Sequence, residues 1–96
     1  MEGVTAKQLP TNQANLSLYP NPSNDQLTIK YNINEAGPVS IIIIDAQGRV
    51  LLYSTEGMTN AGDHTIIPDI GKLKPGIYSV SLQTEKGNLV RKLCKL

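Results

Sequence analysis

Apolar and polar side chains alternate along much of the chain, with the period of two that is typical of half-buried β-strands. The clearest example runs from Tyr78 to Gln83, where Tyr, Val and Leu face one way and Ser, Ser and Gln the other. Residues 25–31 repeat this pattern, with a Leu, an Ile and a Tyr on one face. The pattern predicts about seven short strands, at residues 16–19, 25–31, 39–44, 49–54, 63–68, 78–83 and 89–96.

The most apolar run is Val39-Ser40-Ile41-Ile42-Ile43-Ile44. Continuous isoleucine is typical of a strand that is covered on both faces, or of one whose second face meets a partner. A central position in a sheet is the simpler interpretation, and we expect it here.

Glycine and proline mark the connections between these strands. Residues 45–48, Asp-Ala-Gln-Gly, predict a tight hairpin in which Gly48 takes the left-handed conformation that closes a type I turn with a bulge. Gly87 closes a second hairpin within residues 84–88. Pro75 and Gly76 occupy the second and third positions of Lys74-Pro75-Gly76-Ile77, which favours a type II turn.

Polar segments without periodicity are expected to be loops. Residues 32–38 and 55–62 belong to this class. Pro20 and Pro22 flank Asn21, and since neither proline can donate a backbone hydrogen bond, this segment should form a stiff kink at a sheet edge.

The strand count and spacing predict an all-β fold, an immunoglobulin-like antiparallel β-sandwich. Tyr78 supports this class, because it stands at the mouth of a strand just after a turn. A tyrosine in that place can bury its ring and bond its hydroxyl to the backbone upstream, as the tyrosine corner of such sandwiches does. No helix of ordinary length is predicted.

Length and composition fit one small domain. The chain has 96 residues, no Trp and no Phe, and its core should be built from Ile, Leu and Val. Residues 1–15 are polar and are interpreted as a flexible linker or an expression remnant, and residues 16–96 as the domain. Met1 to Thr5 lack the layout of a signal peptide, and the single Cys94 excludes an internal disulfide.

Charge is distributed unevenly along the chain. Residues 1–71 carry a net charge of −4, and residues 72–96 carry +5. The basic quarter is either a solvated strand face whose lysines protect a sheet edge or a docking surface for an acidic partner. A nucleic acid partner is not expected, because no aromatic platform is interleaved with the charges.

Residues that could carry chemistry are sparse. His64 and Cys94 are the one histidine and the one cysteine, so the usual four-ligand zinc set cannot form. We interpret His64 as a surface or rim residue and Cys94 as a small apolar or exposed strand residue. No glycine-rich phosphate cradle opens a helix. We therefore expect neither an enzyme nor a bound cofactor.

The order and spacing of four motifs resemble the C-terminal sorting domain of cargo proteins of the type IX (Por) secretion system of Bacteroidetes. The resemblance covers residues 16–96, with Cys94 standing where an aliphatic residue is expected. The motifs are Tyr19-Pro20-Asn21-Pro22, the hairpin at residues 44–50, Leu73-Lys74-Pro75-Gly76-Ile77-Tyr78, and the closing strand from Gly87 to Leu93 with Lys95 after it.

The resemblance implies that the domain is an address without chemistry of its own. Cargo of this kind crosses the periplasm, is recognised at the outer membrane by secretion machinery that includes a shuttle or receptor protein, and reaches the cell surface or the medium. A sortase-like cysteine peptidase commonly removes the domain, here within the polar segment before Leu16. The residues carried over as sorting and recognition positions are Pro20, Asn21, Pro22, Gly48, Pro75, Gly76, Tyr78, Gly87, Arg91, Lys92, Leu93 and Lys95.

Two alternatives stay open at this point. The chain is similar in class to immunoglobulin-like or fibronectin-like modules that bind or adhere, although only four tyrosines could stack on a sugar. If the last strand lies at a sheet edge, its free backbone groups can pair with a receptor or, by strand addition or swapping, with a second copy.

Overall fold

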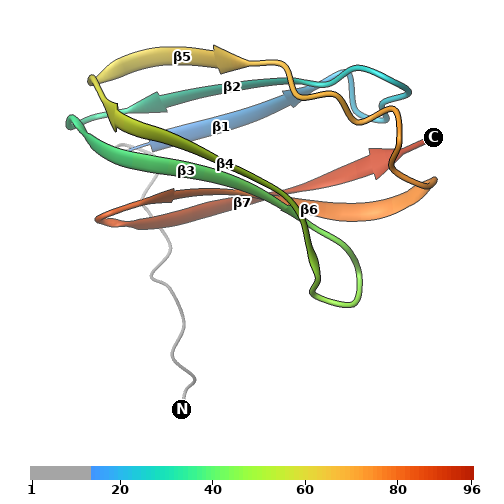
Figure 1. Cartoon of the computed structure of the whole chain (residues 1–96). Coiled ribbons are helices and arrows are strands. Elements are labelled where there is room, and N and C mark those ends of the chain that lie inside the picture. Colours follow the sequence, from blue (N-terminus) through green and yellow to red (C-terminus); the bar gives the residue numbers. More distant parts are fainter. Residues whose placement is uncertain (1–13) are drawn as a thin grey trace.

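The protein is a two-layer β-sandwich (Figure 1). The structure, a computed structural model, describes residues 14–96, and nearly all of the predicted strands are present in that range. The prediction of a linker at residues 1–15 falls mostly on residues 1–13, which lie outside the described residues. The strands are β1 (Ala14–Tyr19), β2 (Thr28–Ile33), β3 (Gly37–Ile44), β4 (Val50–Thr59), β5 (Gly62–Ile66), β6 (Gly76–Thr84) and β7 (Gly87–Lys95).

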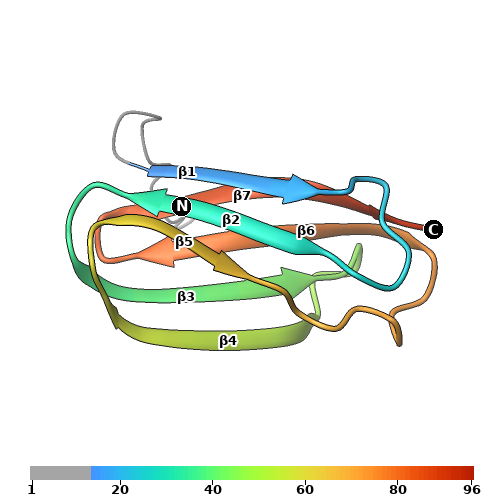
Figure 2. The ribbon, with the colours of Figure 1, turned by 90° about the horizontal axis from the view of Figure 1, so that it is seen from above.

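The strands form two antiparallel sheets. One sheet has the order β1-β2-β5 and the other the order β4-β3-β6-β7, with every pairing antiparallel. Figure 2 shows the three-stranded sheet lying over the four-stranded one. The predicted fold class, an all-β antiparallel sandwich of about seven strands, is confirmed.

The core consists of the side chains that alternate inward from both sheets. On β2 and β6 the inward side chains are those that the alternation predicted, and Ile29, Val80 and Leu82 have no exposed surface. Burying one such aliphatic side chain stabilises the fold by about 1.5–3 kcal/mol. The cluster of buried residues comprises Ala14, Leu16, Leu27, Ile29, Tyr31, Ile33, Val39, Ile41, Ile43, Ile70, Tyr78, Val80, Leu82, Leu89 and Leu93.

The isoleucine run forms the central strand β3, which lies between β4 and β6. Ile41 and Ile43 point into the core, while Ile42 lies on the opposite face and is still only 8% exposed. β3 is therefore covered on both faces at this position. The prediction of a central strand is confirmed.

The two predicted loops are shorter than expected. Residues 55–59 continue β4 and pair with β3. A bulge interrupts this pairing: Gly57 lies opposite Val39 and Thr55 opposite Ser40, which leaves Glu56 as the extra residue. β4 is an edge strand, and one of its faces meets water, so its polar composition does not prevent strand formation. Ile33 likewise extends β2, since its side chain is buried in the core.

The β3–β4 hairpin has the predicted turn. The Gly48 N–H donates to the Asp45 carbonyl and the Asp45 N–H to the Arg49 carbonyl, each at 3.0 Å, and Gly48 has φ of 88°. That backbone conformation is left-handed, which explains the glycine.

The predicted type II turn at residues 74–77 is wrong. Gly76 has φ of 154°, far from the roughly +80° that such a turn requires, because it is already the first residue of β6 and pairs with Lys95. The hydrogen-bonded reversal lies one turn earlier, where the Leu73 N–H donates to the Ile70 carbonyl at 3.0 Å. The buried Ile70 side chain anchors this turn in the core.

Candidate functional site

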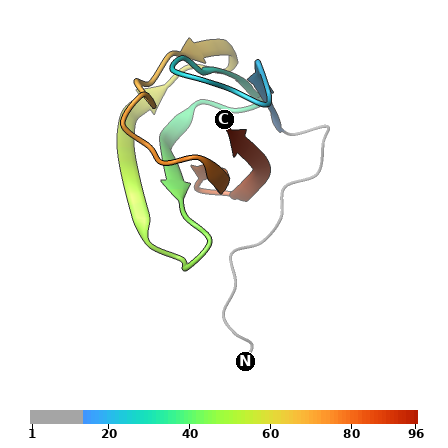
Figure 3. The same cartoon turned by 90° about the vertical axis from the view of Figure 1, so that its right-hand side faces the viewer.

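Three connections and the end of β7 meet at one end of the sandwich. Figure 3 looks onto this end and shows the β1–β2 connection, the β3–β4 hairpin, the β5–β6 connection and the end of β7 together. These segments contain most of the residues proposed for recognition from the sequence. Two residues lie elsewhere: Gly87 is in the β6–β7 hairpin at the opposite end of both strands, and Arg91 is in the middle of β7.

The Asn21 side chain binds the outer edge of β7. Its Nδ2 donates to the Lys92 carbonyl at 2.8 Å, and its Oδ1 accepts from the Cys94 N–H at 3.0 Å. A side-chain amide offers one donor and one acceptor side by side, as a neighbouring strand would. Asn21 therefore takes the place of a strand beyond β7.

Ser23 continues this pairing with its backbone. Its N–H donates to the Cys94 carbonyl at 2.8 Å, and its carbonyl accepts from the Leu96 N–H at 2.7 Å. Its hydroxyl donates to the Pro20 carbonyl, and the residue is fully buried. Residues 20–23 thus cover the edge of β7 from the Lys92 carbonyl to the Leu96 N–H, and this part of the edge is not free for a receptor or a second copy.

Arg91 joins the two sheets at their neighbouring edges. Its Nε donates to the Leu16 carbonyl on β1 at 3.1 Å, and its Nη1 donates to the Val90 carbonyl at 3.1 Å. Arg91 lies on the same face of β7 as the buried Leu89 and Leu93, and this contact gives its charged side chain a partner there. The guanidinium lies between the edges of the two sheets and gives the Leu16 carbonyl, on the edge strand β1, a hydrogen-bond donor.

The exposure of β7 alternates along its length. Leu93 is fully buried and Lys95 is 6% exposed, with Nζ donating to the Leu96 carbonyl at 3.3 Å. Val90 is 41% exposed, and Lys92 is exposed as well. The basic quarter is therefore not one continuous docking surface, since its charges point in different directions.

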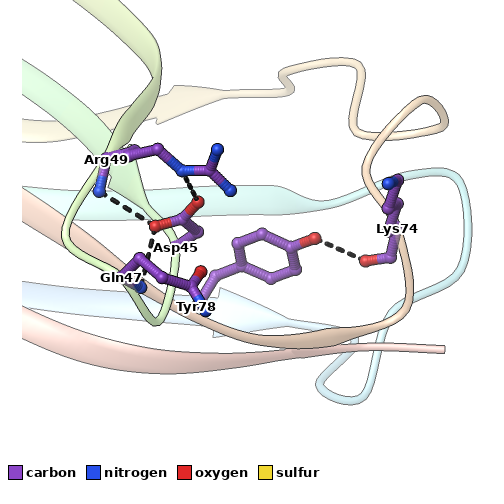
Figure 4. Close-up of polar contacts among 5 residues, drawn as sticks. All are labelled: Asp45, Gln47, Arg49, Lys74 and Tyr78. Carbon is purple, nitrogen blue, oxygen red and sulfur yellow. Dashed lines mark hydrogen bonds and ion pairs between the residues drawn. The ribbon is translucent and has the colours of Figure 1, made fainter.

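The Asp45 carboxylate holds the β3–β4 hairpin in shape (Figure 4). Its Oδ1 accepts from the N–H groups of Gln47 and Arg49, both at 2.9 Å, and its Oδ2 accepts from Arg49 Nε at 2.7 Å. The Arg49 N–H, followed by the Arg49 side chain and the Gln47 N–H, lowers the pKa of the Asp45 carboxyl, against a smaller opposing effect of desolvation.

The tyrosine corner is present. The Tyr78 ring is buried, and its hydroxyl donates to the Lys74 carbonyl at 2.5 Å, as Figure 4 shows. This contact ties the start of β6 to the connection before it. Pro75 and Gly76 lie between the two bonded residues, so this part of the motif has a structural role in positioning the chain.

His64 and Cys94 do not meet. His64 lies on β5, where its ring stacks on Tyr31 with centroids 5.2 Å apart and its Nε2 is 2.6 Å from the Asn60 carbonyl. Burial, and then the Glu56 carboxylate, raise the pKa of Tyr31. Cys94 lies on β7 in the other sheet and pairs with Ile77. The interpretation of His64 as a rim residue fits its half-buried position.

Residues 14–96 contain neither a cluster of metal ligands nor a membrane-spanning helix. No group of three or more His, Cys, Asp or Glu side chains is placed to hold a metal ion. The same residues contain no helix that is long and apolar enough to cross a membrane.

Comparison with known families decides the class of this domain. The family model described as the secretion system C-terminal sorting domain matches residues 17–95, a range that holds all four motifs. The chain belongs to this family. The identification of a type IX sorting domain from its motifs is thereby confirmed, and no curated protein matches the chain.

A type IX sorting domain marks a secreted or cell-surface protein, and its family is one of sorting signals and not of enzymes. The structure adds two residues that the sequence did not single out. Ser23 bonds β7 twice, and Asp45 organises the hairpin. An Asp three positions before a turn glycine is a recognisable turn pattern and could have identified Asp45. No local pattern distinguishes Ser23.

Proposed function

We propose that this domain carries its cargo across the periplasm to a shuttle or receptor protein at the outer membrane, which binds the exposed side of β7. The observation that supports this proposal is the way β7 is held. Asn21 and Ser23 fix one edge, and Arg91 fixes the inner side, so Val90 and Lys92 stand exposed on a strand that is already ordered. A preformed surface binds with less loss of conformational entropy.

We propose further that a sortase-like cysteine peptidase removes the domain by cutting the polar segment before Leu16. β1 begins at Ala14, whose side chain is buried, which supports a cleavage point ahead of that residue. The domain contributes no chemistry to this step.

The test is the export of a reporter protein fused ahead of residues 1–96 in a type IX host. Deletion of residues 91–96 would stop export, but it would also remove Leu93 from the core and the bonds to Asn21 and Ser23, so it tests folding as well. Val90→Asp and Lys92→Glu change exposed side chains and leave the backbone pairing intact.

We expect both variants to hold the reporter in the periplasm at unchanged thermal stability of the purified domain. Lys86→Glu is the matched control, because it reverses an exposed charge in the β6–β7 hairpin, at the far end of the sandwich. Export of the Val90 and Lys92 variants at the level of the control would reject β7 as the binding surface. A wild-type fusion that stays in the periplasm would reject the sorting function.

Self-association by strand addition is proposed for β4 and not for β7. The end of β7 is covered by residues 20–23, whereas no described strand lies beyond β4, which exposes Val50, Leu51 and Tyr53. Sedimentation equilibrium of wild type and Tyr53→Lys tests this arrangement, with the variant expected to remain monomeric. A dimer that is unaffected by the substitution would exclude β4.

The alternative of a sugar-binding module is not favoured. Tyr31 and Tyr78 are buried, and of the four tyrosines only Tyr19 and Tyr53 are well exposed, at 48% and 63%. They lie on different sheets, so they do not form one stacking platform.

A further inference from the structure

A groove lies between the β3–β4 hairpin and residues 72–78, at the end of the sandwich where the motifs gather. Its volume is about 410 Å³, within the range of roughly 300–1,000 Å³ that is usual for ligand sites. Most of each wall comes from a motif that carries the family resemblance, residues 44–50 on one side and 73–78 on the other. The hydrogen bonds of Asp45 and of Tyr78 fix the shape of each wall. They do not account for the open space between the two walls.

Both walls are held in place from within. The Asp45 carboxylate closes the hairpin through three hydrogen bonds, and the Tyr78 hydroxyl fixes the opposite wall through the Lys74 carbonyl. Figure 4 shows both sets of contacts, those of Asp45 in the hairpin and that between Tyr78 and Lys74. Because the walls are preformed, a ligand would not have to order them.

The lining combines apolar and cationic side chains. Leu51 and Ile77 contribute large apolar groups that are 43% and 47% exposed. Arg49, Lys72 and Lys74 add three positive charges. Among the described residues that line the groove, Asp45 carries the one carboxylate, and both of its oxygens already accept hydrogen bonds. The groove thus offers apolar surface in a positive field.

We propose that this groove binds an extended acidic peptide segment of the secretion machinery, with an apolar side chain on Leu51 and Ile77 and flanking carboxylates at Lys72 and Lys74. The proposal rests on the proposed sorting function and adds a second contact surface to that of β7. Charge complementarity selects an acidic segment, and the apolar lining selects a peptide with alternating apolar and acidic side chains.

A nuclear magnetic resonance titration tests binding directly. The probe is a five-residue peptide of alternating Glu and Leu with blocked ends, added to the full 96-residue chain, and the control peptide replaces Glu with Lys. We expect the acidic peptide to shift the backbone amides of residues 45–51 and 72–77, and the basic peptide to leave them in place. Shifts centred elsewhere, no shifts at millimolar peptide, or equal effects of both peptides would overturn the proposal.

The double variant Lys72→Glu with Lys74→Glu identifies the cations that matter. It keeps the Lys74 carbonyl that Tyr78 needs, so the tyrosine corner is preserved. We expect it to weaken binding of the acidic peptide by about tenfold, since reversing two exposed charges changes two ion pairs from attractive to repulsive. Lys86→Glu, outside the groove, should leave the affinity unchanged. Equal affinity of wild type and double variant would overturn the assignment.

Export of the reporter fusion separates this proposal from the sorting function on which it rests. If the wild-type fusion reaches the surface and the double variant stays in the periplasm, the groove is required for sorting. If both reach the surface equally, the groove proposal fails while the sorting function stands. If the wild-type fusion is not exported, the sorting function itself fails, and the groove loses its proposed partner.

Discussion

Asn21 and Cys94 are 73 positions apart in the chain, and the Cys94 N–H donates to the Asn21 side-chain oxygen at 3.0 Å. Pro20 and Pro22 on either side of Asn21 have no backbone N–H to donate to a neighbouring strand, and the Asn21 side chain supplies the hydrogen bonds to β7. The first motif and the last strand therefore form one structural unit. Removing either one exposes the backbone of the other.

Asn21→Ala tests this unit. The substitution removes the partner of the Lys92 carbonyl and of the Cys94 N–H, and since both bonds lie at the exposed surface we expect the free energy of unfolding to fall by about 0.5–1.5 kcal/mol. Urea denaturation of the 96-residue chain measures the change. Asn24→Ala is the matched control, as Asn24 is an exposed asparagine in the same connection and should change stability by less than about 0.5 kcal/mol. Equal stability of both variants would show that the Asn21 side chain does not stabilise the contact between the first motif and β7.

Arg91→Ala should loosen the seam between the sheets. The variant loses the hydrogen bond to the Leu16 carbonyl, which we expect to lower stability by about 1 kcal/mol. Amide hydrogen exchange gives the sharper measurement, because exchange should accelerate on β1 more than on the central strand β3. Lys92→Ala, which removes a neighbouring exposed cation, serves as the control. Uniform acceleration on both strands would show that Arg91 acts only on global stability.

Tyr78→Phe isolates the hydroxyl of the tyrosine corner. The ring stays in the core, but the Lys74 carbonyl loses its donor, and we expect a loss of about 1–2 kcal/mol in the free energy of unfolding. Tyr53→Phe removes a hydroxyl from a tyrosine that is 63% exposed and should have almost no effect. Thermal or urea unfolding of Tyr78→Phe and Tyr53→Phe measures the difference. If the two variants are equally stable, the Tyr78 hydroxyl does not stabilise the fold.

Strands and turns were predicted best where they depend on local pattern. Alternation from Tyr78 to Gln83 and the turn chemistry of residues 45–48 depend on a few neighbouring residues, and both appear in the structure as expected. Residues 55–59 were predicted as a loop because an edge strand with one wet face has the composition of a loop. For Gly76, the Pro-Gly pair favoured a turn, but pairing with Lys95 extended the backbone.

The contacts of the candidate site depend on topology, which no local pattern contains. Nothing around Asn21 or Ser23 indicates that their partners are Lys92, Cys94 and Leu96, because the match exists only after β7 is placed beside the β1–β2 connection. The contact of Arg91 has the same origin, since its acceptor, the Leu16 carbonyl, lies on β1 in the other sheet.

We expect the free energy of unfolding to depend on pH through the ionisation of the Asp45 carboxyl. Its pKa is lowered in the folded protein, chiefly by the Arg49 N–H, so the charged form is the one that favours folding. This contribution is therefore fully present above the pKa of the unfolded chain, about 3.9, and is lost as the pH falls through the lower folded value. Asp45→Asn keeps an acceptor oxygen but removes the charge.

We expect wild type to be more stable than Asp45→Asn at neutral pH, and the difference to shrink as the pH falls below about 3.9. Urea unfolding of both proteins across the acidic range measures it. Asp69→Asn provides the control, because within residues 14–96 the Asp69 carboxylate accepts one backbone hydrogen bond, from Gly71, and pairs with no side-chain cation. A wild-type advantage that persists unchanged in acid would mean that the hairpin depends on the geometry of the side chain and not on its charge. The hairpin wall of the groove would then keep its shape in acid.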